Sequence, residues 1–229
     1  MDLRAQNKEK RRQRILFEAR RIIARDGFDA LTTRGLAEAA GVTQPTLYNL
    51  IGSKDNLFRI LMAESVARVW DRLKRFEGAD PLETIEAVAI EPTALFAADE
   101  PYYRAAVIAS DRMVGVLAAA PRAEEQPFTI AREAVRMATE ATERAVVAGL
   151  LRGRVAAHVL GEQLYICFRG PLRDWAYGLI SLETFQMRAL RGFYMTLAID
   201  AAAEFRALLE KKLFKLIEAT PAAPSCAAS

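Results

Sequence analysis

The side chains whose types and spacing could do chemistry lie close together in residues 43–51, which read TQPTLYNLI. Leu47, Leu50 and Ile51 are spaced i, i+3, i+4, so they share one face of a helix that we expect to be buried. The polar residues between them must then face outward, where amide, hydroxyl and phenol groups can hydrogen-bond base edges. The residues expected to reach bases are Gln44, Pro45, Thr46 and Tyr48, with Asn49 at the edge.

Two short helices joined by a tight turn are needed to present that face. Thr32 can cap the first helix, and Gly41 stands where a left-handed residue would end it. Thr43 can cap the second helix, with Pro45 in its first turn, where a missing N–H is tolerated. This layout predicts a helix-turn-helix whose second helix enters the major groove of DNA.

Basic residues are concentrated at the same end of the chain. Residues 1–25 hold nine Lys/Arg against three Asp/Glu, whereas residues 59–229 hold 21 against 22. A basic end on a nearly neutral body indicates a polyanionic partner there, although a solvated helix face would have the same composition. Besides the cluster Lys8, Lys10, Arg11, Arg12 and Arg14, phosphate contacts are expected from Thr33, Arg34, Thr43 and Lys54.

The segment AEAAGVTQPTLYNLIGSKDNLF resembles the helix-turn-helix signature of the TetR family of bacterial one-component regulators. The resemblance covers roughly residues 10–60. Ile51 stands where the family usually has Phe, and Asn49-Leu50 replaces a common Tyr–His or Arg–His pair, so the operator sequence cannot be taken from relatives. The resemblance implies a homodimeric repressor that a small-molecule effector releases from palindromic double-stranded DNA. Without it, the segment could be a helical hairpin with no nucleic-acid role.

Helical periodicity continues to the end of the chain, with no strand-like alternation, so the expected fold class is all-α with about nine or ten helices. The expected domains are a three-helix DNA-binding domain over 1–58, a larger ligand-binding and dimerisation domain over 59–218, and a disordered tail over 219–229. Caps, glycines and prolines predict a mobile arm over 1–8 and a loop over 115–126. The helices they predict are 7–25, 53–75, 82–112 (divided at Pro92 and Pro101), 127–151, 156–179 (bent at Gly170-Pro171) and 181–217.

The last two of these helices are apolar on more than one face. Leu164 and Ile166 on the first, and Phe185 and Phe193 on the second, illustrate the pattern. A helix that is apolar nearly all round is buried on both sides. A second subunit is the simplest cover, giving a four-helix bundle in a homodimer, as the resemblance also implies; a deep monomer core is the alternative.

Catalytic constellations are missing from the sequence. His158 is the only histidine and has no carboxylate three or four residues away, and no phosphate-cradling glycine loop or C-x-x-C occurs. Cys167 and Cys226 cannot build a disulfide framework, the N-terminus is charged, and no apolar run approaches the ~20 residues that span a bilayer. We therefore expect a cytoplasmic non-enzyme without signal peptide, membrane span, metal or cofactor.

Aromatic and thioether side chains are spread over the middle helices. Most of them would be ordinary core, but apolar rings with polar tips can also enclose an apolar ligand. The resemblance implies such an effector pocket, for which the candidates are Trp70, Phe96, Tyr103, Met113, Met137, Phe168 and Trp175. Two other functions fit the same sequence: a helical small-molecule binder or enzyme that keeps a helix-turn-helix head, and a transcriptional activator.

Overall fold

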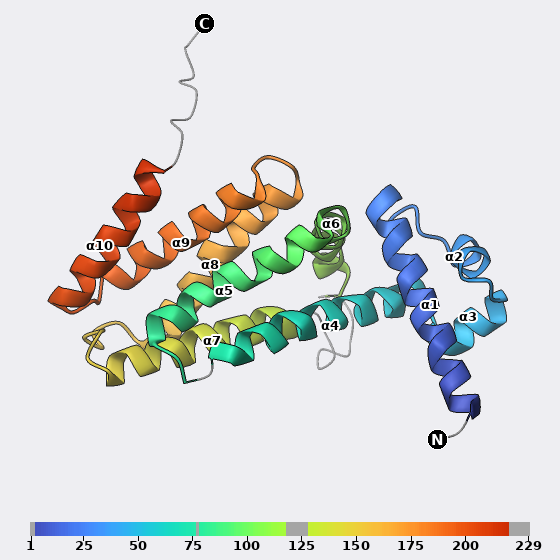
Figure 1. Ribbon diagram of the computed structural model, residues 1–229, viewed down its shortest axis with the longest axis horizontal. Coiled ribbons are helices and arrows are strands. Elements are labelled where there is room, and N and C mark those ends of the chain that lie inside the picture. The colour runs from blue at the N-terminus through green and yellow to red at the C-terminus, as the bar shows by residue number, and fades with distance from the viewer. Residues whose placement is uncertain (1–2, 77, 118–127, 220–229) are drawn as a thin grey trace, which may run out of the picture. The chain divides into compact units, whose positions relative to one another are not determined.

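The computed structural model describes residues 3–76, 78–117 and 128–219. Within these ranges the chain is all-helical apart from one isolated bridge, which confirms the predicted fold class (Figure 1). The helices are α1 Leu3–Asp26, α2 Thr33–Ala40, α3 Gln44–Ile51, α4 Lys54–Leu73, a 3-10 turn Lys74–Phe76, α5 Pro81–Ala98, α6 Glu100–Leu117, α7 Phe128–Val147, α8 Ala157–Ala176, α9 Leu182–Ala198 and α10 Ala203–Glu218. None of these helices, over the ranges described, has the length and apolarity to cross a bilayer.

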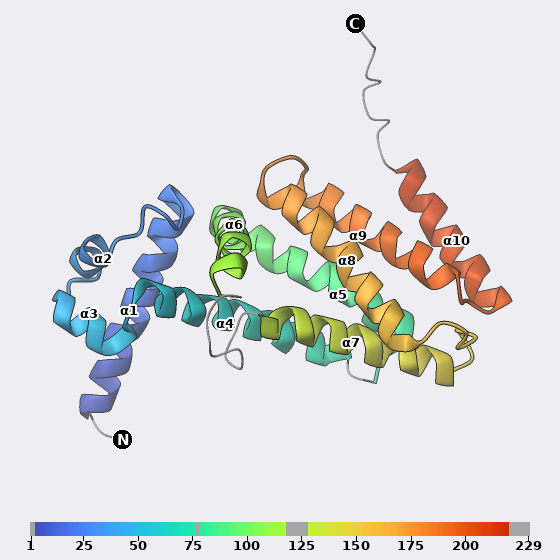
Figure 2. The same ribbon diagram turned by 180° about the vertical axis from the view of Figure 1, so that it is seen from behind.

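The first helices form a small core at the N-terminal end. α1 packs against α2, α3 and α4 (Figures 1 and 2), and Ile15, Leu16 and Ile23 of α1 are buried. The arm expected over residues 1–8 is wrong from Leu3 onward, because α1 already begins there. Arginine, lysine, glutamine and glutamate dominate its first turns, and these straight-chain residues lose little rotamer freedom in a helix.

The described chain divides into two compact units. The first comprises Met1–Arg75, Ala94–Ile130 and Trp175–Leu179, and the second Phe76–Thr93, Ala131–Asp174 and Ile180–Ser229. The first unit therefore keeps the whole of α4 with α1–α3, and it adds α6, which packs against α1. The division at residue 58 between DNA-binding and ligand-binding domains stays a prediction, and residues 220–229 of the expected tail lie outside the described residues.

Of the two prolines expected to divide residues 82–112 into separate helices, only one lies at a helix boundary. α5 runs through Pro92 without a break, whereas Pro101 does lie in the first turn of a new helix, α6. Pro92 itself is buried, and so are Ala89 and Phe96 on either side of it. Burial of these neighbours offsets the ~3 kcal/mol that an internal proline costs a helix. α8 also continues through Pro171, as the single helix expected there requires, and the bend expected at Gly170-Pro171 stays a prediction.

The single helix expected over 181–217 is wrong, because it is interrupted between α9 and α10 at residues 199–202. Asp200 is fully buried there, and its carboxylate accepts hydrogen bonds from the backbone N–H of Gly153 (2.8 Å) and of Arg154 (3.0 Å). The backbone pairs as well: Arg152 N–H donates to the Asp200 carbonyl at 2.8 Å, and Ala202 N–H donates to Leu150 at 2.8 Å. The interruption therefore packs against the loop that follows α7. The helix α7 itself ends at Val147, and not near residue 151 as expected.

Candidate nucleic-acid interface

The two helices of the predicted helix-turn-helix are α2 and α3, and their ends are capped as the sequence indicates. Thr32 Oγ1 accepts from Gly35 N–H at 3.1 Å, and Thr43 Oγ1 accepts from Thr46 N–H at 3.3 Å. Gly41 has φ 62°, and its N–H donates to the Glu38 carbonyl at 3.1 Å. A left-handed residue at this point ends α2 and turns the chain into α3.

The face of α3 that was expected to read bases is open. Leu47 and Ile51 are buried against the rest of the small core, whereas Tyr48 is 69% exposed. Gln44, Pro45 and Asn49 are exposed as well. Among the described residues, the side chains of Gln44, Tyr48 and Asn49 find no hydrogen-bond partner. Thr46 differs, because it is half-buried and its hydroxyl lies 2.9 Å from that of Thr43.

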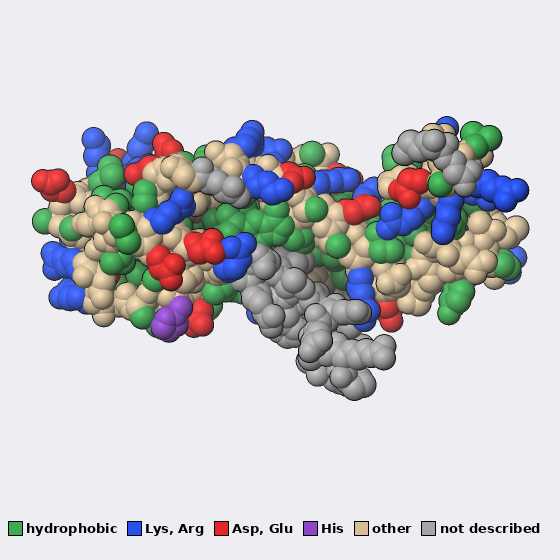
Figure 3. All heavy atoms as spheres, turned by 90° about the horizontal axis from the view of Figure 1, so that it is seen from below, with side chains coloured by type: hydrophobic (Ala, Val, Ile, Leu, Met, Phe, Trp, Pro, Cys, Tyr) green, Lys and Arg blue, Asp and Glu red, His purple; other side chains and the backbone are tan. Residues whose placement is uncertain are grey.

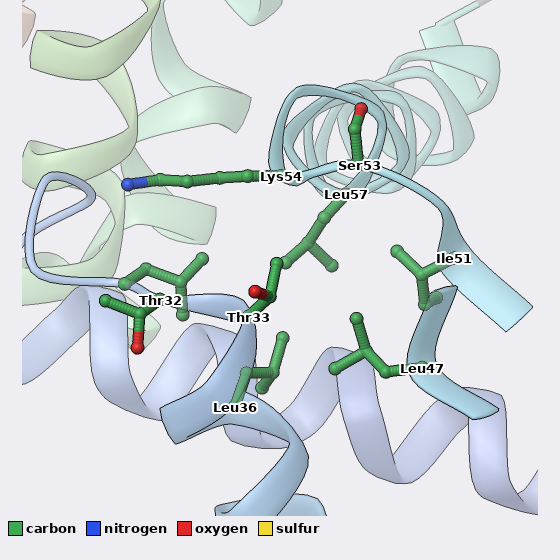
Figure 4. A pocket seen from close by; sticks show the side chains of 9 residues that line it. Thr32, Thr33, Leu36, Leu47, Ile51, Ser53, Lys54 and Leu57 are labelled. Carbon is green, nitrogen blue, oxygen red and sulfur yellow. The ribbon is translucent and has the colours of Figure 1, made fainter. Parts of the chain in front are cut away.

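Two of the residues expected to bind phosphate already have partners within the chain. Arg34 Nε donates to Glu38 Oε1 at 3.1 Å on the exposed surface of α2. Lys54 leaves α4 toward the loop before Thr32 (Figure 4), where Nζ donates to the Asp29 carbonyl at 3.2 Å and lies 4.6 Å from the centre of the Phe28 ring. Their phosphate roles stay predictions, as do those of the exposed residues Thr33 and Thr43.

A small cavity lies between α2, α3 and α4 (Figure 4). Its volume is about 10 Å³, and it is lined mostly by apolar side chains. That is no more than the space of a single water, and an apolar gap of this size stays dry. The cavity is a packing gap in the helix-turn-helix core and offers no room for an effector. Its lining residues are Leu31, Thr32, Thr33, Leu36, Leu47, Ile51, Ser53, Lys54 and Leu57.

The cations of α1 fall into two groups. In its second half Arg20 pairs with Glu64, Arg21 lies 3.3 Å from Glu18, and Arg25 lies 2.7 Å from Asp26. The hydrogen bond from Arg25 lowers the pKa of the Asp26 carboxyl, which keeps that pair ionised. In the first half Arg12 is 3.7 Å from Glu9. Four further cations of this half make no hydrogen bond or ion pair with any described residue: Lys8, Lys10, Arg11 and Arg14.

Three of the seven residues proposed for an effector pocket lie together in the first unit. The ring centres of Phe96 and Tyr103 are 5.1 Å apart, and those of Phe96 and Trp175 are also 5.1 Å apart. All three side chains are buried. Tyr102 adds a fourth ring, 5.0 Å from Tyr103. The Tyr103 hydroxyl is buried and has no hydrogen-bond partner in the described part of the chain. Burial raises the pKa of Tyr102, and hydrogen bonding with Ser65 and Arg20 opposes that shift.

An ion pair that the sequence analysis missed borders this aromatic cluster. Arg104 Nη2 is 2.6 Å from Glu100 Oε1, and the guanidinium lies 5.0 Å from the Trp175 ring centre and donates to the Trp175 carbonyl. Trp175 Nε1 donates to Glu100 at 3.1 Å. The hydrogen bond from Arg104 lowers the pKa of Glu100, while burial opposes the shift. The i, i+4 spacing of Glu100 and Arg104 was the available sequence signal.

The other proposed pocket residues are not part of this cluster. Phe168 packs against Phe185 in the second unit, with ring centres 5.3 Å apart, and Met137 is half-buried on α7. Trp70 is half-buried on α4, and the Met113 side chain lies outside the described residues. The single histidine, His158, is exposed (purple in Figure 3). Over the ranges described, no three His, Cys, Asp or Glu side chains gather as metal ligands would.

Over the described residues the chain is therefore all-helical, with a helix-turn-helix near its N-terminus whose second helix has an exposed polar face. Residues 15–61 match the model for bacterial regulatory proteins of the tetR family. The match spans 47 of the 229 residues and contains both helices of the helix-turn-helix, so this part of the chain is similar to that family.

Curated relatives are similar over the same region. The HTH-type transcriptional repressor KstR of Rhodococcus jostii is 32% identical over 92 residues, which is 40% of this chain and 43% of that protein. The HTH-type transcriptional repressor AcnR of Corynebacterium glutamicum is 41% identical over 58 residues, which is 25% of this chain and 31% of that protein. The similarity thus spans less than half the length of each relative.

Solved structures share the fold over most of the chain. A gamma-butyrolactone receptor (ArpA-like protein) superposes with a TM-score of 0.64 at 19% identity, covering 93% of this chain and 100% of that one. SmeT, described as the repressor of the Stenotrophomonas maltophilia multidrug efflux pump SmeDEF, gives a TM-score of 0.65 at 20% identity, covering 85% and 92%. At these identities the likeness concerns the fold alone.

Proposed function

We propose that this protein is a homodimeric transcriptional repressor that a small apolar effector releases from a palindromic operator in the cytoplasm. The observation that carries the proposal is the exposed face of α3, where Gln44, Tyr48 and Asn49 have no partner among the described residues while Leu47 and Ile51 hold the helix in place. Polar side chains left free on a fixed helix face are what base-edge recognition requires. The relatives KstR and AcnR are themselves described as repressors.

On DNA, each α3 enters the major groove, and the two copies lie about 34 Å apart, or a multiple of that, along one face of the duplex. Gln44, Pro45, Thr46 and Tyr48 lie nearest the bases, with Asn49 at the edge. Thr33, Arg34, Thr43 and Lys54 contact phosphates, for which Arg34 and Lys54 must exchange their present partners Glu38 and Asp29. Those exchanges lower the net gain from each contact, since a bond is lost for each one formed.

The proposed dimer uses α8 and α9. The two helices approach closely, because a methyl group on Gly192 would lie 2.7 Å from Cys167 Cβ. Beside this contact Ile166 of α8 is 60% exposed and Met195 of α9 is 64% exposed, and Val159 and Ile199 are exposed as well. A monomer core accounts for buried Leu164 but not for these residues. Large apolar side chains on two paired helices favour a four-helix bundle with a second copy.

The dimer is tested by sedimentation equilibrium. Ile166→Glu and Met195→Glu are expected to give monomers, because a charge would be buried in the bundle. Ile217→Glu is the matched control, since Ile217 is an exposed apolar residue of α10 with 46% exposure. Equal dissociation by the control, or a monomeric parent protein at micromolar concentration, would contradict the bundle.

For the effector we propose an apolar molecule bound in the body next to Phe96, Tyr103 and Trp175. The buried hydroxyl of Tyr103 would orient a ligand oxygen or nitrogen, since an unpaired buried hydroxyl gains most from a new hydrogen bond. The ligand would bind better to an arrangement in which the two helix-turn-helix domains are splayed or rotated. It then lowers operator affinity by the same factor by which DNA lowers ligand affinity. α6, which packs on α1, and α4 are the elements that would transmit this coupling.

The proposed function is tested by selecting duplexes from a random pool with purified protein. A palindromic site is expected, with half-site spacing that reports the dimer. Candidate apolar ligands are then titrated into the protein–operator complex, and tight binders that leave DNA affinity unchanged would refute the coupling. Reporter output with and without the protein distinguishes repression from activation, and the absence of any selected duplex would overturn the DNA-binding assignment itself.

A further inference from the structure

Arg14 of α1 lies against the turn of the helix-turn-helix, although it is far from that turn in the sequence. A methyl group placed on Gly41 would be 3.3 Å from Arg14 Nη2, 3.6 Å from Cζ and 3.7 Å from Nη1. Three such similar distances indicate that the guanidinium lies face-on against the glycine. The side chain is nonetheless exposed to solvent.

This position is next to the start of the recognition helix. Gly41 ends α2, and Thr43, the cap of α3, follows only two residues later. Because the donors of a guanidinium lie in its plane, a guanidinium that rests flat on a glycine keeps N–H groups free at its edges. Gly41 thus leaves open the space that the guanidinium of Arg14 occupies beside this turn.

Arg14 also differs from the other cations near α2 and α3 in having no partner. Arg34 is paired with Glu38, and Lys54 donates to the Asp29 carbonyl. Arg14 makes no hydrogen bond or ion pair with any residue in the described part of the chain. Its charge is permanent, and it presents N–H donors to solvent beside the recognition face. Binding an anion there displaces water but no partner within the described part of the chain.

We propose that Arg14 binds a backbone phosphate of the operator beside the N-terminus of α3 and so fixes how the recognition helix enters the groove. The proposal rests on the proposed function, since the phosphate belongs to the operator. Arginine matches the geometry of phosphate with two parallel hydrogen bonds, and phosphate contacts set the register in which bases are read. The competing role is structural, in which the cation only stabilises the C-terminus of α2 through the helix dipole.

The test compares Arg14→Gln and Arg14→Lys with Arg25→Gln. Arg25 is the matched control because it is another exposed arginine of α1, but it is paired with Asp26. Operator affinity is measured by fluorescence anisotropy at salt concentrations from about 50 to 200 mM, on a duplex selected by the parent protein. Loss of one phosphate contact lowers the salt slope by about 0.9, so the ratio of parent to Arg14→Gln affinity should fall by about 3.5-fold over this range. Arg14→Lys should keep the parent slope, as should Arg25→Gln.

The other outcomes overturn the assignment. A parent-like slope for Arg14→Gln excludes a phosphate contact, and an equal loss in Arg25→Gln shows a general effect of charge. Thermal unfolding of each variant separates the structural role: a Tm that is lowered in Arg14→Gln and restored in Arg14→Lys, together with a parent-like salt slope in Arg14→Gln, assigns Arg14 to helix stability. If the parent protein selects no duplex, the proposed function fails first, whereas a bound duplex with an unaffected Arg14→Gln variant removes only this proposal.

Discussion

Replacing Asp200 tests whether one buried carboxylate holds the interruption between α9 and α10 against the loop after α7. The carboxylate is fully buried and accepts the Gly153 N–H at 2.8 Å and the Arg154 N–H at 3.0 Å, while Arg154 Nε lies 3.7 Å away. In Asp200→Ala both backbone donors lose their acceptor. In Asp200→Asn the side-chain oxygen can keep one of them.

The magnitude follows from these contacts. A hydrogen bond to a charged group contributes about 1.5–3 kcal/mol to stability, which gives an upper limit of about 6 kcal/mol for the pair. Gly153 and Arg154 are exposed, so their freed N–H groups can reach water, and the cost lies near the lower limit. We expect Asp200→Ala to lower the free energy of unfolding by about 3 kcal/mol and Asp200→Asn by about half as much.

The assay is equilibrium unfolding in urea followed by circular dichroism, at two protein concentrations so that dissociation of a dimer is separated from unfolding. Arg154→Ala is the control. Its side chain is 64% exposed, so loss of its ion pair should cost less than about 1 kcal/mol. A change below about 0.5 kcal/mol for Asp200→Ala would refute the reasoning. An equally large loss in Arg154→Ala would assign the effect to the ion pair instead of the backbone bonds.

Three further predictions concern the proposed interface and the aromatic cluster. Gln44→Ala should weaken operator binding by about 1–3 kcal/mol and relax specificity at one position, as measured by competition with single-base variants of the site. Lys54→Ala should weaken binding to all duplexes alike and lower the salt slope by about one, and an equal loss of slope in Gln44→Ala would contradict both assignments. Because the Arg104 hydrogen bond lowers the pKa of Glu100 in the folded protein, its stabilisation is complete at neutral pH and is lost as the pH falls from about 4.5 through the lower folded value. Glu100→Gln should therefore show a smaller decrease of Tm than the parent protein between about pH 5 and pH 3, and parallel curves would exclude the effect.

The helix-turn-helix could be predicted from the sequence because its signals are local. A cap at Thr32, a left-handed glycine at Gly41 and a cap at Thr43 each act within four residues, and each forms the expected hydrogen bond or dihedral angle. The i, i+3, i+4 spacing likewise predicted that Leu47 and Ile51 are buried and that Tyr48 is exposed, whereas Leu50, expected on the same buried face, is only half-buried. Local chemistry sufficed because no distant partner competes for these groups.

Helix boundaries in the body depend on distant partners and were predicted less well. No residue between 181 and 217 is a proline, and only Gly192 is a glycine, so periodicity alone predicted one helix. The interruption forms because Asp200 finds backbone donors at residues 153 and 154, which lie 47 and 46 positions earlier in the chain. Pro92 shows the reverse case, where burial of Ala89 and Phe96 outweighs a local helix breaker. In both cases tertiary contacts override the local preference.

The same distinction decides which cation can bind phosphate. From the sequence, Arg34 and Lys54 are expected individually to contact phosphate, whereas Arg14 is only one of five cations in a basic cluster that could also be a solvated helix face. Their partners separate them: Arg34 has Glu38 one helical turn away, Lys54 reaches the Asp29 carbonyl 25 residues away, and Arg14 rests on Gly41 with its donors free. A free guanidinium gains the whole of a new phosphate contact, whereas a paired cation gains only the difference between two contacts. At a fixed salt concentration Arg14→Gln should therefore lose at least as much operator affinity as Lys54→Ala, and a larger loss in Lys54→Ala would show that DNA displaces the Asp29 contact at little cost.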